Sequence, residues 1–243
     1  MLAYAWFELK RLLRSPGLML YTVVMPVASY VVFTAVGSDS GTAEGLQINA
    51  TVMIGLAGYG ALIGVLSVSA AVSSERTQGW LRQLRITPLR SWEVLVVKLL
   101  TCTPIAIPSI IAVGLAGYLE HGITMPVGRW ALILIALWIG TFPFALLGLA
   151  MGYALKPSVA QSMSFLAFFI LSALGGLLVP VEAFPKTLQH LAHVLPSNRY
   201  AELGWRAGGG HLPTGGGILI LAAWTVLFGV LTMVAYRRSA ATR

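Results

Sequence analysis

The strongest constraint on this chain is a series of long stretches without a charged residue. A helix of about 20 residues crosses the hydrocarbon core of a bilayer, and one charge at its centre costs roughly 2.5–3.5 kcal/mol. Six such stretches predict spans at about 18–36, 50–72, 97–119, 130–154, 159–179 and 216–236. We therefore expect an all-α integral membrane protein with six transmembrane helices, which form a single transmembrane domain over residues 1–243.

The composition supports lipid as the solvent for most of this surface. Charged residues make up 10% of the chain, whereas a soluble domain has about 25%. The apolar runs are continuous rather than alternating, so they predict helices and not the strands of a membrane barrel. The first run exceeds the roughly 7–15 residues of a signal-peptide core, so we expect it to be retained. Prolines at 26, 104, 108 and 143 interrupt several runs and predict tolerated kinks, with hinges as the alternative.

The positive charges predict the orientation. Six spans place both termini on one side, which would hold twelve of the 16 Lys and Arg residues, while Arg129, Lys186, Arg199 and Arg206 fall on the other. Positive residues favour the cytoplasmic side, so we expect a multi-pass protein of the plasma membrane with both termini in the cytoplasm. This asymmetry accounts for the net charge of +8 without nucleic acid, since no basic stretch is interleaved with aromatic residues.

Two segments on the expected cytoplasmic side are amphipathic. Residues 2–14 predict a helix lying in the membrane interface, although a simple basic anchor would have a similar sequence. Residues 74–92 follow the second predicted span and form the predicted coupling segment. There, residues at helical spacing form one face of a predicted helix. This helix ends at Thr87-Pro88, because proline disfavours helix in the residue before it. This face alone does not distinguish a helix resting on lipid from one that docks on a cytoplasmic partner.

The segment 181–210, on the expected outer side, predicts two short helices before the last span. Half-buried helices of this kind can re-enter the bilayer where protein shields them, so we expect short outer re-entrant helices. His190 and His193 are three residues apart, but no third ligand of suitable spacing accompanies them, so no metal is predicted. The single cysteine, Cys102, excludes an intrachain disulfide and is expected to be a small buried hydrophobe.

Two motifs, in this order, resemble those of the type-2 ABC transporter permease family. After the second predicted span the chain has Glu75-Arg76, Gly79, Leu81, Leu84, Thr87-Pro88-Leu89, Glu93 and Lys98. Between the fifth and sixth spans it has Gly175-Gly176, Pro180, Pro185, Pro196 and Tyr200. The order of spans and the amino-terminal amphipathic segment are also similar. The chain departs from the family at Leu177-Leu178-Val179, where the family often has aromatic residues.

The resemblance implies the membrane-spanning half of an ATP-driven exporter, of the kind that performs drug efflux. A second permease, either another copy or a paralogue, would complete the path as a dimer, and a separate ATP-binding subunit would dock on the loop 75–90. ATP and Mg would then bind on that partner subunit, and no cofactor would bind directly to this chain. The implied ATPase-coupling residues are Glu75, Arg76, Gly79, Trp80, Leu81, Leu84, Thr87 and Pro88.

The sequence contains no phosphate-binding loop of the Gly-x-x-x-x-Gly-Lys-Ser/Thr type, and no Gly-Lys pair occurs anywhere in it. If the chain moves its cargo by means of ATP, another polypeptide must hydrolyse it. We therefore expect this chain not to be an enzyme.

The content of the predicted spans bears on the cargo. None has a central acid or base, which argues against proton coupling and against a highly charged cargo. An apolar path with aromatic and hydroxyl groups suits an amphipathic drug, lipid or peptide-like cargo, and the candidate path residues are Phe142, Ser162, Phe165 and Phe169. Each aromatic could instead face lipid or pack against a neighbouring helix.

Three other functions remain open at this stage. A channel or secondary carrier would need no ATPase partner, and a scaffold would move no cargo. An intramembrane protease would need a base at membrane depth, but all four histidines lie outside the predicted spans.

Overall fold

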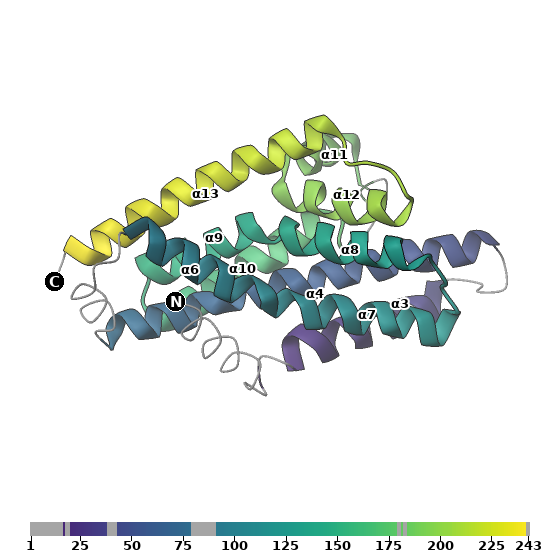
Figure 1. The fold of residues 1–243 in the computed structure, drawn as a ribbon, viewed down its shortest axis with the longest axis horizontal. Helices are drawn as coiled ribbons and strands as arrows, with labels where there is room; N and C mark the ends of the chain where they lie inside the picture. Colours follow the sequence, from purple (N-terminus) through teal and green to yellow (C-terminus); the bar gives the residue numbers. More distant parts are fainter. Residues whose placement is uncertain are drawn as a thin grey trace.

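The structure, a computed structural model, describes residues 17, 20–37, 43–78, 91–178, 181 and 184–241 (Figure 1). These residues form helices and turns, and no strand occurs among them. The predicted interfacial helix at 2–14 and residues 79–90 of the predicted coupling segment lie outside the described residues. The all-helical architecture expected from the apolar runs is confirmed.

The described part of the chain is divided into helical segments. In chain order they are η1 (Leu20–Val24, a π-helix), α3 (Met25–Gly37), α4 (Ala43–Thr77), α6 (Ser91–Cys102), η2 (Thr103–Ile105, a 3-10 helix), α7 (Ala106–His121), α8 (Val127–Gly140), α9 (Phe142–Ala154), α10 (Pro157–Leu174), α11 (Lys186–Val194), α12 (Pro196–Gly208) and α13 (Gly215–Ala241).

Within the described residues, five helical stretches are long and apolar enough to cross a membrane, and they overlap the last five predicted spans. Their bounds are Gly45–Thr77, Glu93–His121, Val127–Ala154, Pro157–Leu174 and Gly215–Ser239. The first predicted span corresponds to a shorter apolar helix, Leu20–Ala35. The chain is therefore a multi-pass membrane protein, and the count of six spans stays a prediction.

Prolines break two of the long stretches where kinks were expected. Pro104 lies in η2, between α6 and α7, and Pro143 lies in the first turn of α9. Proline has no N–H to donate, so the helical hydrogen-bond ladder is interrupted at these points. Beside the second break, the Thr141 hydroxyl donates to the carbonyl of Trp138 at 2.6 Å. In lipid such a local bond satisfies a backbone group that the break would leave exposed.

Helix α4 is the centre of the bundle, with α3, α7, α9, α10 and α12 packed around it (Figure 1). Its core residues Leu62 and Val65 are fully buried. Helix α13 lies at the edge, where it packs mainly along α9. Its exposed face is apolar, with Leu219, Val226 and Val230 largely uncovered. A face of this kind is suited to lipid rather than to water.

Two glycines spaced four residues apart bring α9 against α4. A Cβ added to Gly152 would lie 2.7 Å from the Ser69 carbonyl oxygen, and one added to Gly148 would lie 3.1 Å from that of Val65. Membrane helices have little hydrophobic drive to associate, so small residues that permit close backbone approach favour their packing. The Gly148–Gly152 pair therefore fixes where α9 sits on the central helix.

The segment between α10 and α13 differs in detail from the expectation. Helix α10 ends at Leu174, before the predicted limit of 179, because Gly176 adopts φ +84°, a left-handed conformation that favours glycine. Helices α11 and α12 fill the predicted outer segment 181–210. The buried Tyr200 of α12 donates a hydrogen bond to the carbonyl of Gly58 in α4 at 3.3 Å. Re-entry of these helices into the bilayer stays a prediction.

Candidate coupling end and transport cavity

One end of the bundle, which we call the basic end, carries Arg76, Lys98, Lys156, Arg237 and Arg238. Helices α4, α9 and α13 finish there, and α6 and α10 begin there (Figure 1). The predicted coupling segment is attached at this end, since it follows α4 and precedes α6.

A buried ion pair ties the last turn of α4 to α6. The Lys98 ammonium lies 2.7 Å from a carboxylate oxygen of Glu75. The two side chains are only 3% and 14% exposed. A buried charge is costly unless a partner of opposite sign compensates it. The pair therefore fixes the position of α6 relative to the point where the coupling segment begins.

Arg76, the next residue, ties the same turn of α4 to the end of α9. Its guanidinium donates to the Tyr153 carbonyl and, at 2.7 Å, to the Leu155 carbonyl. The Ser73 hydroxyl donates to the Leu155 carbonyl at 2.6 Å. The last carbonyls of a helix have no partner within it, and a cation near them is favourable. Arg76 and Ser73 thus cap α9 from α4.

The structure separates the predicted coupling residues into two groups. Glu75 and Arg76 make the internal ties just described. The other six lie outside the described residues, so their contact with an ATPase stays a prediction; they are Gly79, Trp80, Leu81, Leu84, Thr87 and Pro88. Sequence reasoning did not find the pairing of Glu75 with Lys98. A signal was present, because Lys98 falls just inside the predicted third span, and a charge there calls for a partner.

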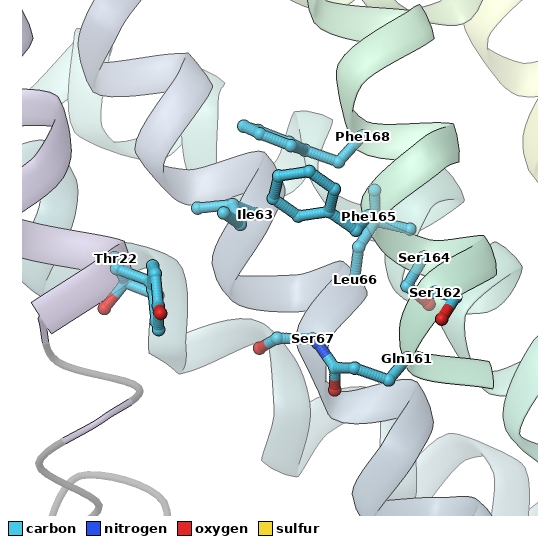
Figure 2. Close-up of a pocket in the computed structure, with 10 residues that line it drawn as sticks. Thr22, Ile63, Leu66, Ser67, Gln161, Ser162, Ser164, Phe165 and Phe168 are labelled. Carbon is cyan, nitrogen blue, oxygen red and sulfur yellow. The ribbon is translucent and has the colours of Figure 1, made fainter. Parts of the chain in front are cut away.

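A cavity of about 690 Å³ lies between η1, α4 and α10 (Figure 2). Figure 2 shows Thr22 on η1 and Ser67 on α4 beside the cavity. On α10 it shows Gln161, Ser162, Ser164, Phe165 and Phe168. None of the described residues that line it is charged; they are Tyr21, Thr22, Ile63, Leu66, Ser67, Gln161, Ser162, Ser164, Phe165 and Phe168. The cavity therefore combines apolar and aromatic surface with hydroxyl and amide groups.

Polar contacts at membrane depth hold the α4–α10 wall of the cavity. The Ser69 and Ser164 hydroxyls lie 2.5 Å apart, and Ser69 also donates to the Ala160 carbonyl at 3.3 Å. The ring of Phe168 packs on Tyr59 of α4, with centroids 4.7 Å apart. Phe165, by contrast, is 58% exposed. The wall is thus fixed on its inner side, and the cavity opens toward the surface at Phe165.

The predicted path residues do not all reach this cavity. Ser162 and Phe165 line it. Phe142 packs edge-on against Trp138 in another part of the bundle, with ring centroids 6.0 Å apart. Phe169 is exposed on α10 and is not part of the lining. The role of all four in a transport path stays a prediction.

Other lining residues were missed in the sequence, and the signal for them was their polarity within apolar runs. Thr22, Ser67 and Gln161 are polar residues that fall inside the first, second and fifth predicted spans. A polar group at membrane depth usually faces protein or a cavity rather than lipid.

At the opposite end, Glu202 of α12 connects the short helices to the start of α13. It accepts hydrogen bonds from the Arg199 guanidinium at 2.7 Å and from the Thr214 hydroxyl at 2.5 Å. Burial alone would raise the pKa of Glu202. The hydrogen bonds from Thr214 and Arg199, with the charges of Arg199 and Arg206, outweigh this effect and hold the pKa below its ordinary value. Glu202 therefore acts as an ionised anchor.

The fold places this chain among the multi-pass helical membrane proteins. The described residues that line the cavity between its helices are uncharged, and the end of α4 is tied to α6 and α9. Comparison with known sequences gives the family. The chain belongs to the ABC-2 type transporter family, whose profile matches residues 1–203. It is therefore a membrane transport subunit.

Two relatives illustrate the similarity. The chain is 29% identical over 240 residues to YvfS of Bacillus subtilis (strain 168), named as a transport permease, and the match covers 96% of each chain. It is also 29% identical over 153 residues to YbhR of Escherichia coli (strain K12), named as a multidrug ABC transporter permease. That second match covers 58% of this chain and 39% of YbhR.

Proposed function

We propose that the chain is the membrane-spanning subunit of an ATP-driven exporter in the plasma membrane, with both termini in the cytoplasm. A second permease forms the path with it, and a separate ATP-binding subunit docks on the loop 75–90. The cargo is an amphipathic drug, lipid or peptide-like molecule. Membership of the ABC-2 type family supports a subunit that works within an ABC transporter.

The observation that carries the proposal is the double attachment at the end of α4. Glu75 is paired with Lys98 of α6, and Arg76 caps α9. A force applied to the loop therefore reaches α4, α6 and α9 together. Because α4 also forms one wall of the cavity, displacement of the loop changes the cavity. A device that couples ATP hydrolysis to transport needs this mechanical link.

The cavity supports the cargo class. Its volume of about 690 Å³ lies within the roughly 300–1,000 Å³ of small-molecule sites. The described residues of its lining are uncharged, so an amphipathic cargo would bind there without leaving a charge unpaired. The similarity to YbhR, named as a multidrug permease, fits a cargo of this kind.

The surface around the cavity mouth supports a second permease. Phe165 of α10 is 58% exposed, and Tyr21 of η1 is 56% exposed. A second copy packed on this face would close the cavity and bury these rings. Burial of aromatic rings is a large favourable contribution to association.

The ATPase partner is tested by copurification. The reading frames beside this one are searched for a soluble ATPase with a phosphate-binding loop, and the chain is co-expressed with it. ATP hydrolysis is then measured with the complex in lipid vesicles. We expect the two to copurify, the chain alone to hydrolyse no ATP, and the variant Trp80→Ala/Leu81→Ala/Leu84→Ala to lose the partner. Transport that persists without the ATPase, and is unaffected by this variant, would establish a channel or secondary carrier instead.

The cavity is tested with two matched variants of α10. Phe165→Ala removes a lining ring, and Phe169→Ala removes an equally exposed ring that does not line the cavity. In vesicles loaded with rhodamine 6G or a fluorescent phospholipid, we expect Phe165→Ala to lower kcat/KM for ATP-dependent transport about tenfold, the low end for one lost apolar contact. We expect Phe169→Ala to change it less than about twofold on the same scale. Equal effects would contradict a role for this cavity in cargo binding.

A further inference from the structure

The hydroxyl and amide groups in the cavity between η1, α4 and α10 define which polar head it can bind. We propose that the cavity selects an amphiphile with a polyol head, such as a glycerol or a sugar. The head hydroxyls donate hydrogen bonds to serine oxygens and accept them from the amide of Gln161, while the apolar part of the molecule lies on Phe165 and Phe168. The inference names the cargo class of this cavity and therefore rests on the function proposed above.

Two serine hydroxyls of the cavity already donate their protons to their own helices. Ser67 donates to the Gly64 carbonyl at 2.7 Å, and Ser162 donates to the Ser158 carbonyl at 3.1 Å. A hydroxyl has one proton to donate and two lone pairs that accept. Both oxygens can therefore accept a hydrogen bond from a ligand while they keep the bond to the helix. A ligand group that only accepts, such as an ether, finds no donor at these two positions.

Gln161 supplies a donor to the same cavity. Its side chain is exposed, and Figure 2 shows it extending from α10 toward α4, where Ser67 lies. A primary amide has two N–H donors and one carbonyl acceptor, and the phenol of Tyr21 on η1 can either donate or accept. A ligand that satisfies Ser67 and Gln161 together must both donate and accept. A hydroxyl does both through one oxygen atom, which favours a polyol head.

The polar and aromatic groups of the cavity are separated along the bundle axis. Helix α10 begins at the basic end, so Gln161 lies nearer to that end than Phe165 and Phe168 do. Seven residues of helix separate Gln161 from Phe168, about 10 Å. Helix α4 finishes at the basic end, so Ser67 likewise lies nearer to it than Ile63 does. An amphiphile would therefore bind with its head toward the basic end, as a lipid of the leaflet at that end is oriented.

The head contact is tested by native mass spectrometry of the purified full chain, in a detergent without hydroxyl groups. The probes are 1-monooleoylglycerol and its dimethyl ether, which keeps the oxygens of the head as acceptors but has no proton to donate. We expect the unmodified chain to bind monooleoylglycerol about tenfold more tightly than the ether, the effect of about one strong hydrogen bond. Equal binding of the two probes would overturn the proposal.

Variants of the lining assign the contacts. Ser67→Ala removes one acceptor, so it should weaken binding of monooleoylglycerol about fivefold and leave binding of the ether unchanged. Thr51→Val is the matched control, because the Thr51 hydroxyl makes the same kind of bond on α4, to the Gln47 carbonyl at 3.0 Å, and does not line the cavity. Gln161→Leu should weaken binding of both probes, since both accept from its amide.

A loss of both probes in Ser67→Ala, or an equal loss in Thr51→Val, would mean a change in packing and would also overturn the proposal. The binding measurement uses neither ATP nor an ATPase, so its outcome is distinct from that of the proposed function. If ATP-dependent transport of rhodamine 6G occurs but the two glycerol probes bind equally, the exporter stands and the polyol head is wrong. If monooleoylglycerol is preferred but no ATP-dependent transport occurs, the exporter is wrong and the cavity is a polyol site without export.

Discussion

Breaking the Glu75–Lys98 pair should be among the most damaging single changes at the basic end. The two charged atoms lie 2.7 Å apart, and Lys98 is only 3% exposed. At an effective dielectric constant of about 20, the attraction at this distance is about 6 kcal/mol before desolvation. Removing one partner leaves the other charge buried, which typically costs about 3–5 kcal/mol. We therefore expect Lys98→Met and Glu75→Gln each to lower the free energy of unfolding by about 3 kcal/mol.

The double variant distinguishes the contribution of the ion pair from the cost of leaving one charge buried alone. In Glu75→Gln/Lys98→Met neither charge remains, so the free energy of unfolding should return to within about 1 kcal/mol of the unmodified chain. The charge exchange Glu75→Lys/Lys98→Glu is a second control, since it keeps an ion pair and reverses its direction. The measurement is loss of helical circular dichroism during titration with sodium dodecyl sulfate in mixed micelles.

A clear result would refute this reasoning. If both single variants stay within about 1 kcal/mol of the unmodified chain, the pair behaves like an exposed surface ion pair. The tie between α4 and α6 would then be too weak to carry force. If instead the double variant is stable but no longer supports stimulation of the partner ATPase, the pair is needed for coupling beyond its contribution to folding.

Three further predictions concern other parts of the molecule. Gly152→Ala should lower the free energy of unfolding by about 1–3 kcal/mol, whereas Gly229→Ala, whose added Cβ would meet nothing closer than 3.9 Å, should not lower it in the same titration. The depressed pKa of Glu202 contributes stability above its unfolded-state pKa, and this is lost as the pH falls through the folded value. The difference in Tm between the unmodified chain and Glu202→Gln should therefore be full at pH 7 and shrink as the pH falls below the ordinary pKa of a glutamate, about 4.3. An impermeant maleimide should label Gln78→Cys only in inside-out vesicles and Leu212→Cys only in intact cells. Both positions are exposed, and the chain's own cysteine is buried. The reverse labelling pattern would overturn the proposed orientation.

The helices were predictable because each depends on its own local composition. A long uncharged run specifies a membrane helix whatever its neighbours are, and the five long stretches match runs in the sequence. The end of α10 was misplaced because Gly176 leaves the helical conformation within an apolar run. Hydropathy does not register a change in backbone conformation.

The contacts of the candidate site were not predictable in the same way. The cavity takes its polar groups from three segments, at Thr22, Ser67 and Gln161, that only the packing brings together. The sequence pointed to Glu75 and Arg76 as coupling residues but not to their internal partners. Those partners lie 23 residues or more along the chain, and no periodicity connects positions on different helices.

Two of the spans packed around α4 are broken, at η2 and at Thr141, and these breaks determine how a force at the basic end would act on them. Helix α4 is 35 residues long without a proline, about 52 Å of regular helix, so it should move as a rod. Glu75 holds α6, which lies before the break at η2, and Arg76 holds α9, which lies after the break at Thr141. Glu75 and Arg76 therefore each contact only one half of a broken span, the half that is nearer the coupling segment. A displacement of the loop should then bend these spans at their breaks, while Tyr200 keeps the middle of α4 attached to α12 at Gly58.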